Sequence, residues 1–522
     1  MQNDMLMKGL RRKERYHKEP KQVSKYSFSF CFIIVIAFLF GSCSAIKYSS
    51  YNPQNKIAPE KLKKDFILLK KILEANHPSL YWYTPKDSIN SYFNQTLQSI
   101  NDSLTEIQFR NKVAWFIAKI RCGHTTVRPS KAFVKYVSKH EFNRFPLLLK
   151  VWNDSLIVLG SLNRNDSALK RGSLVTSIDG HTSHELLDSI FQFISTDGYA
   201  ANFKNQAISF NFPVYYSFAY PLKDSFFIRY TDSTGVQKET YVKLFKPSSD
   251  TAKFKLPGIK TRPPTHKEKK LISLLNKRSI TYDTVNRIAY MRIATFSDGK
   301  LNSFFKQSFR ELKNKNLHNL IIDLRENTGG SITTSINLAR YIKDKPFRLA
   351  DTVAAINRSL TYGRYINLSL FYRVVMRFTT HKKTDGKFHF VALEKYAYKP
   401  LRNLHYNGNV YIVQGGYTFS AAAMFVLNVK GQQNVTVVGE ETGGGDYGTS
   451  AVHLPSIILP NSKVQVVLPL YRIVDDSTKI KDGHGIQPDV FIPPSSTAIK
   501  QGIDIKLQTI KKLIQQHAVK GE

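Results

Sequence analysis

Residues 319–330 read NLIIDLRENTGG, and residues 409–416 read NVYIVQGG. Each stretch is an apolar run that ends in paired glycines, and a helical pattern follows each of them. Each of these apolar runs is predicted to form a strand. A third run, NVTVVGEE at residues 434–441, has the same character. The alternation of strands and helices predicts an α/β layered core over residues 285–496.

The chain changes character twice ahead of this core. Residues 59–135 carry apolar residues at three- and four-residue steps, which predicts a helical domain. Residues 142–250 contain short β-type runs separated by turn residues. Within them, ALKRGSLVTSIDGHTSHELLDSI (168–190) resembles a PDZ-like module, in which a peptide adds to the edge of a sheet. Three further segments are a basic linker, an aromatic-rich insertion in the core without an assigned role, and a C-terminal helix: 251–284, 345–408 and 497–522.

The N-terminus carries an export signal. A Lys/Arg-rich stretch at residues 8–25 precedes an apolar run at residues 28–40, which is too short for a membrane-spanning helix. The run leads into LFGSC, which resembles a bacterial lipobox. The pattern predicts a signal peptide over residues 1–42, a lipidated Cys43 and a polar tether over residues 43–58. An uncleaved anchor helix is the alternative, and both alternatives place the chain in the cell envelope, attached to a membrane.

Composition limits the partners and the chemistry. The formal net charge is +37, but the positive residues are spread along the chain without zinc-finger spacing or an RNP-type motif. We therefore expect no nucleic-acid partner. The three cysteines are Cys31, Cys43 and Cys122. Cys31 lies in the predicted signal and Cys43 is the predicted lipid acceptor, so neither a disulfide framework nor a thiolate metal site is expected.

A candidate nucleophile follows the strand at residues 409–416. In YTFSAAAMF, Ser420 would lie at the first turn of a helix, where free N–H groups favour developing negative charge. The glycines at the end of residues 319–330 suit a tight turn with an exposed N–H. Ser420 as a simple N-cap and the glycines as an ordinary turn are the alternatives.

The chain resembles the tail-specific, or C-terminal processing, serine peptidases. The segments that carry the resemblance occur in the family's order: ATFSDGKLNSFFKQSFRELK, NLIIDLRENTGG, TFSAAAMF, VVGEETGGG and GHGIQPDV. The resemblance implies a crotonase/ClpP-like fold of stacked β-β-α units and a polypeptide substrate. It implies neither a metal nor an organic cofactor.

The resemblance also indicates which residue serves as the base. Ser–Lys members of the family carry a lysine shortly after the fourth segment, whereas here the next lysine is Lys463. The tricorn-core-like subgroup uses a histidine in a motif similar to CGHT, which implies His124. The subgroup also places a carboxylate at the position of Asp482, which would orient that histidine. His484 is a rival base.

On this resemblance, Ser420 attacks the scissile carbonyl and His124 takes its proton. The N–H of Ala421 and that of Gly329 or Gly330 would hold the oxyanion. Ala423 stands where many members have Glu, and Cys122 stands where Asp is frequent. A catalytically degenerate binding protein on the same fold therefore remains an alternative. A crotonase-type acyl-CoA enzyme is disfavoured by the export signal.

Overall fold

A six-stranded sheet contains the three apolar runs. Its strands, in spatial order, are β10 (Arg278–Asp283), β11 (Ile288–Ile293), β12 (Asn319–Asp323), β16 (Asn409–Gln414), β17 (Val435–Gly439) and β22 (Val490–Phe491). Neighbours from β11 to β22 pair in parallel, and β10 pairs with β11 in the antiparallel sense. The predicted α/β core is confirmed.

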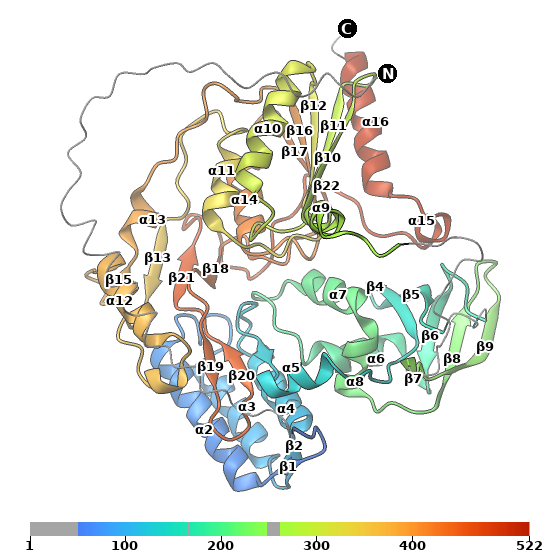
Figure 1. Ribbon diagram of the computed structural model, residues 1–522, viewed down its shortest axis with the longest axis vertical. Coiled ribbons are helices and arrows are strands. Elements are labelled where there is room, and N and C mark those ends of the chain that lie inside the picture. The colour runs from blue at the N-terminus through green and yellow to red at the C-terminus, as the bar shows by residue number, and fades with distance from the viewer. Residues whose placement is uncertain (1–50, 164–165, 167, 248–261, 521–522) are drawn as a thin grey trace. The chain divides into compact units, whose positions relative to one another are not determined.

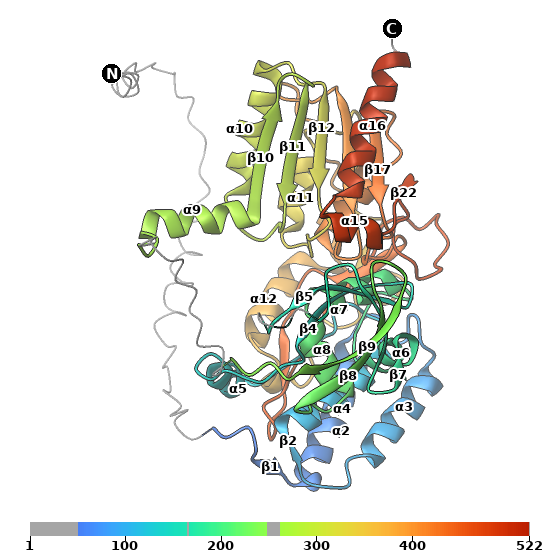
Figure 2. The same ribbon diagram turned by 90° about the vertical axis from the view of Figure 1, so that its right-hand side faces the viewer.

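Helices cover both faces of this sheet. The first face packs against α10 (Leu301–Asn314), α11 (Ile332–Ala339) and α14 (Ala421–Val429), and the opposite face packs against α16 (Ile505–Lys520) (Figures 1 and 2). Because neither face meets water, the central strands are apolar along their whole length. Burial on both faces explains why these strands are uninterrupted apolar runs in the sequence.

This computed structural model describes residues 51–163, 166, 168–247 and 262–520. The predicted signal peptide, Cys43 and most of the predicted tether lie outside the described residues, as do residues 248–261. Within the described part, none of the helices has the length and apolar character needed to span a membrane.

The six-stranded sheet starts earlier in the sequence than expected. Part of the predicted basic linker forms α9 (His266–Lys277) and the edge strand β10. Ile280 and Tyr282 alternate with polar residues and pack against the core of the sheet. The lysine-rich composition around this short alternation concealed it, because an edge strand needs only one apolar face.

The N-terminal helices share their core with a second sheet. These helices are α2 (Pro59–Asn76), α3 (Lys86–Gln98) and α4 (Glu106–Ala118), whereas α5 (Lys131–Val137), which follows them, has no buried residue. The second sheet has the order β14 (His381–Lys382), β15 (Phe388–His389), β13 (Thr352–Ala355), β21 (Tyr471–Val474) and β18 (Gly448–Ala451). One continuous cluster of buried side chains joins α2 and α4 to β13 and β21. The insertion at residues 345–408 thus supplies strands to this sheet, together with α12 (Ser369–Thr379) and α13 (Val391–Lys395).

Residues 142–250 contain an antiparallel sheet with its own apolar core. Its strands are β4 (Leu147–Trp152), β5 (Ser155–Ser161), β6 (Leu174–Ile178), β8 (Ser225–Thr231) and β9 (Gln237–Lys243), with β7 (His181–Thr182) beside β6. Its helices are α6 (Ser183–Phe191), α7 (Ala201–Phe210) and α8 (Phe212–Ala219). The Ile-Asp-Gly turn joins β6 to β7, with φ of 51° at Asp179 and 88° at Gly180. The PDZ-like identity of this region remains a prediction.

Asp65 on helix α2 connects this helix to residues 461 and 462 through hydrogen bonds. A small sheet of β19 (Ser456–Ile458), β20 (Gln465–Val467) and β3 (Val127–Arg128) holds the loop that Asp65 contacts. The fully buried carboxylate of Asp65 accepts hydrogen bonds from the backbone N–H and side-chain amide of Asn461, at 3.0 and 2.8 Å. It also accepts from the N–H and hydroxyl of Ser462, both at 2.7 Å. One carboxylate therefore satisfies four donors.

We predict that Asp65→Ala lowers the free energy of unfolding by about 2–4 kcal/mol, because buried donors lose their acceptor. Urea denaturation of the variant and the wild type measures the difference. Glu60→Ala, at an exposed position of the same helix, is the matched control and should change stability by less than about 0.5 kcal/mol. Equal stability of Asp65→Ala and Glu60→Ala would contradict the connecting role of Asp65.

Candidate active site

Ser420 lies on a strained turn between β16 and α14. Its backbone has φ of 54° and ψ of −127°, a conformation that costs a non-glycine residue about 1–3 kcal/mol. The side chain makes no capping hydrogen bond, so the N-cap alternative does not describe this serine. The hydroxyl is partly exposed, whereas the three alanines after it are buried. The turn therefore presents a hydroxyl group at the start of a helix.

Two backbone N–H groups beside Ser420 are available to an oxyanion. Neither Gly330 nor Ala421 donates its N–H to a partner in the part of the chain that the structure describes. The N–H of Gly329, in contrast, donates to Asn327 Oδ1 at 2.8 Å. Of the two predicted glycines, Gly330 is thus the available donor. Gly329 has φ of 100°, and a Cβ there would come within 2.7 Å of Ser420 Cβ, so it serves the close approach of the two loops.

His124 reaches this turn from the N-terminal segment between α4 and β3. Its side chain is buried, and its ring lies 4.6 Å from the ring of Phe419, centroid to centroid. Phe419 directly precedes Ser420 in the chain. A Cβ on Gly123 would come within 2.6 Å of the Phe419 ring, so this glycine permits the contact. The structure therefore places His124, the predicted base, against the residue that precedes Ser420, the predicted nucleophile.

A hydroxyl relay connects His124 to a buried carboxylate. Thr449 Oγ1 on β18 donates to Asp197 Oδ2 at 2.7 Å and lies 3.3 Å from His124 Nδ1. Because the Thr449 proton is used on Asp197, its oxygen accepts from His124 Nδ1–H. This network assigns the neutral tautomer with a bare Nε2, the nitrogen that can take a proton from a nucleophile. Asp197 also accepts the Gly123 N–H at 2.8 Å, which fixes the loop that carries His124.

Burial sets the protonation of these groups. It lowers the pKa of His124 to about 4, so the imidazole is neutral near pH 7. Burial raises the pKa of Asp197 to about 6, so this carboxylate is largely ionised at pH 7. Burial also raises the pKa of the Cys122 thiol to about 12. Cys122 therefore stays a neutral thiol beside the site.

Asp482 and His484 do not take the positions expected of them. Asp482 is exposed, and its carboxylate accepts the N–H of His484 at 2.9 Å within its own turn. His484 lies 3.3 Å from Glu441 Oε1 and is half exposed. The carboxylate that supports His124 is Asp197 instead. The loop of Asp482 still contributes indirectly, because the Gly483 carbonyl accepts the Tyr199 N–H at 2.7 Å next to Asp197.

Sequence reasoning missed Asp197 and Thr449. Asp197 belongs to a Ser-Thr-Asp-Gly stretch, which is indistinguishable from an ordinary turn. Thr449 lies in the stretch after GEETGGG, where the absence of lysine was noted. The missing lysine was the one sign of Thr449 in the sequence, because another residue near this position had to assist the candidate nucleophile.

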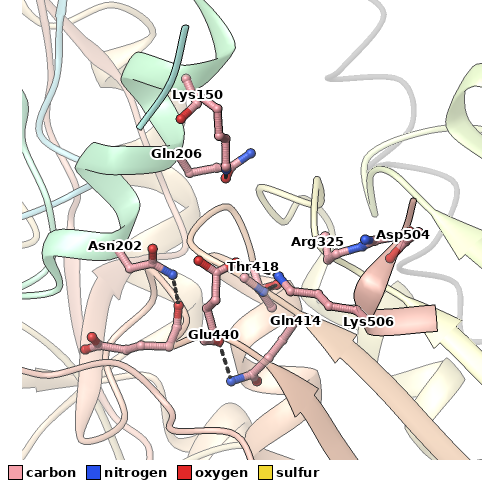
Figure 3. Close-up of polar contacts among 12 residues, drawn as sticks. Lys150, Asn202, Gln206, Arg325, Gln414, Thr418, Glu440, Asp504 and Lys506 are labelled. Atoms are coloured by element: carbon pink, nitrogen blue, oxygen red, sulfur yellow. Dashed lines mark hydrogen bonds and ion pairs between the residues drawn. The ribbon is translucent and has the colours of Figure 1, made fainter. Parts of the chain in front are cut away.

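A buried polar network includes Gln414 and Thr418, which precede Ser420 in the chain (Figure 3). Thr418 Oγ1 donates to the Leu324 carbonyl at 3.0 Å and so ties this turn to the end of β12. Gln414 Nε2 donates to the Glu440 carbonyl at 2.9 Å, and the Glu440 carboxylate pairs with Lys506 of α16. The network thus joins β16, the glycine-rich loop after β17 and the C-terminal helix. It holds the loop before Ser420 in one conformation.

A serine on a strained turn, N–H groups beside it and a neutral imidazole that contacts the preceding residue are groups of the kind that serine hydrolases use for acyl transfer, so Ser420 and His124 are candidates for these roles. The two candidates come from opposite ends of the chain.

Comparison with known proteins identifies the family. Residues 287–492 match the model of Peptidase family S41. Residues 287–492 thus form a serine-type peptidase domain of family S41. No curated protein matches the sequence.

Solved structures share the fold. The structure of mature CPAF complexed with lactacystin aligns with a TM-score of 0.63 at 15% sequence identity, over 88% of this chain and 98% of that chain. A crystal structure of mature CPAF aligns with a TM-score of 0.60 at 15% identity, over 88% and 97% of the two chains. At this identity the likeness concerns the fold.

We predict that the rate of serine acylation falls in two steps as the pH is lowered. Near pH 6 Asp197 takes a proton and ceases to support the imidazolium, and near pH 4 His124 itself takes a proton. The second-order rate of fluorophosphonate labelling between pH 3.5 and 9 measures both steps, with circular dichroism to verify folding. In Asp197→Asn the step near pH 6 should disappear and the plateau should fall about tenfold. A single step near pH 6.5 that persists in this variant would contradict the assignment.

Proposed function

We propose that this chain is an exported endopeptidase, anchored by lipid, that cleaves polypeptides through an acyl-enzyme on Ser420. The observation that carries the proposal is the strained Ser420 turn, whose preceding residue Phe419 packs against a neutral His124 with its Nδ1 occupied by the Thr449–Asp197 relay. A buried imidazole fixed in this tautomer has one free nitrogen for proton transfer.

The proposed mechanism follows from these positions. Ser420 Oγ attacks the carbonyl carbon of the scissile bond while His124 Nε2 takes the hydroxyl proton. The N–H groups of Gly330 and Ala421 hold the oxyanion, and loss of one such donor typically costs about 10²–10³ in turnover. His124 then gives the proton to the leaving amine, and water releases the acyl-enzyme with His124 again as base. Thr449 and Asp197 are positioning residues, since they act through His124.

Both departures from the family pattern are compatible with activity. Ala423 is buried in α14, and a Cβ on Gly444 would come within 2.5 Å of its Cβ. Gly444 fills the space beside residue 423, so a glutamate side chain at position 423 would not fit. The thiol of Cys122 is neutral and supplies no charge to the site. The charge that supports His124 comes from Asp197, which lies on another loop. A binding protein with a dead site is the alternative, and it needs no activated hydroxyl.

We predict that the wild-type chain is labelled by a fluorophosphonate and that Ser420→Ala abolishes the label. His124→Ala should lower the labelling rate at least about 10³-fold, because the serine then lacks its base. Gel fluorescence and intact-protein mass measure the label. Cleavage of an unfolded protein substrate should fall in parallel.

Three variants serve as controls for this experiment. Ser303→Ala removes an exposed hydroxyl on α10 and should leave labelling unchanged. Asp482→Asn and His484→Ala should each change the rate less than about threefold, since neither residue contacts His124. A folded wild type that takes no label would favour the binding protein. Loss of labelling in His484→Ala but not in His124→Ala would reassign the base.

The export proposal rests on the N-terminal sequence, with its basic stretch, apolar run and LFGSC motif. We predict that a bacterial host fed an alkyne-tagged fatty acid attaches the tag to the chain, and that Cys43→Ala loses it. Cys31→Ala, within the signal, should keep the tag. N-terminal mass analysis separates the two alternatives, because cleavage leaves Cys43 as the first residue. An intact N-terminus without lipid would indicate the uncleaved anchor helix.

A further inference from the structure

A cavity of about 350 Å³ lies on the far side of the loop that carries His124. Its walls come from the end of α4 and the residues after it, the start of α3, the end of α6 and the segment leading into α7. Three cations line it, namely Lys119, Arg121 and Lys204, and no Asp or Glu does. The volume is in the range of pockets that hold small molecules.

The three cations have only neutral partners. Lys119 Nζ donates to Gln192 Oε1, and Lys204 Nζ donates to the Phe191 carbonyl at 3.1 Å. The Arg121 guanidinium lies 4.2 Å from the centroid of the Tyr199 ring. None of the three forms an ion pair within the residues that the structure describes. The three side chains are partly buried, and three cations around a cavity that no carboxylate lines make it favourable for an anionic group.

The charges also act on one another. Burial, together with the positive charges of Arg121 and Lys119, lowers the pKa of Lys204 to about 8. Burial and the charge of Arg121 lower the pKa of Lys119. Repulsion of this kind destabilises the empty cavity, and an anion placed among the three groups would reverse it.

The walls of this cavity belong to the loops that position the catalytic base. The Arg121 carbonyl accepts the N–H of Gly198 at 3.0 Å, so the two loops are joined at the cavity. Asp197, the residue before Gly198, accepts the N–H of Gly123, which is two residues after Arg121, and the hydroxyl of Thr449. The Asp197 carboxylate is therefore committed to the His124 side and does not neutralise the cavity.

We propose that this cavity is a binding site for a small ligand that carries a phosphate or carboxylate group. The anionic group lies among Lys119, Arg121 and Lys204, and its occupancy braces the paired loops and with them the relay behind His124. The binding site stands independently of the peptidase activity. Its effect on acylation rests on the proposed function.

Isothermal titration calorimetry of the full chain in detergent tests the site, at low ionic strength because salt screens such contacts. Inorganic pyrophosphate probes the phosphate chemistry and citrate the carboxylate chemistry. We expect at least one to bind, and Lys204→Gln and Arg121→Gln each to weaken its Kd about tenfold or more. Lys306→Gln, which removes an exposed charge on α10, should leave the Kd unchanged.

The outcomes separate the possibilities. Absence of binding of both probes to the folded wild type overturns the site, as does equal binding by Lys204→Gln and Lys306→Gln. Thermal melting of each variant without ligand verifies that it folds. Fluorophosphonate labelling with and without the bound probe then tests whether occupancy of the cavity affects acylation. We expect the labelling rate to change at least threefold in the wild type and not in Lys204→Gln. Binding without a change in the labelling rate overturns the proposed effect on acylation, whereas the proposed binding site stands.

Discussion

The close approach of two loops at Gly329 and Ser420 is the constraint on which the rest of the site depends. Parallel pairing of β12 with β16 brings the ends of both strands to one edge of the sheet, and Gly329 fits against Ser420 only because it lacks a side chain. Phe419 N–H donates to the Asn327 carbonyl at 3.1 Å across this junction. The turn therefore keeps its strained serine, and the free N–H groups of Gly330 and Ala421 stay beside it.

Two features position the candidate base His124. Its side chain is buried, and Thr449 connects it to the carboxylate of Asp197. His124, Asp197 and Thr449 come from three separate parts of the chain, and each alone would be an unremarkable polar residue. Together they fix one tautomer, because the hydroxyl of Thr449 has a single proton and gives it to Asp197. The loops that make these contacts also line the cationic cavity. A ligand there would act on the base without touching the substrate.

Sequence patterns predicted the parts of the fold that are buried on both faces. The strands β12, β16 and β17 were recognisable because each is an uninterrupted apolar run, and the helical character of α2 and α4 was visible in their three- and four-residue spacing. Strand β10 was missed because only Ile280 and Tyr282 face the core. The role of residues 345–408 was invisible, since β13, β14 and β15 are short and pair with strands distant in the sequence.

The sequence by itself determined the sheet, the family resemblance, the candidate nucleophile Ser420 and the candidate base His124, because motif order and apolar runs are local properties. Only the tertiary structure decided which carboxylate serves His124 and which glycine N–H is free. Asp197 replaces Asp482 because long-range packing, rather than spacing along the chain, brings β18 and the loop before α7 to the imidazole. Gly330 rather than Gly329 is free because Asn327 occupies the Gly329 N–H. Hydrogen-bond partners so far apart along the chain leave no local pattern in the sequence.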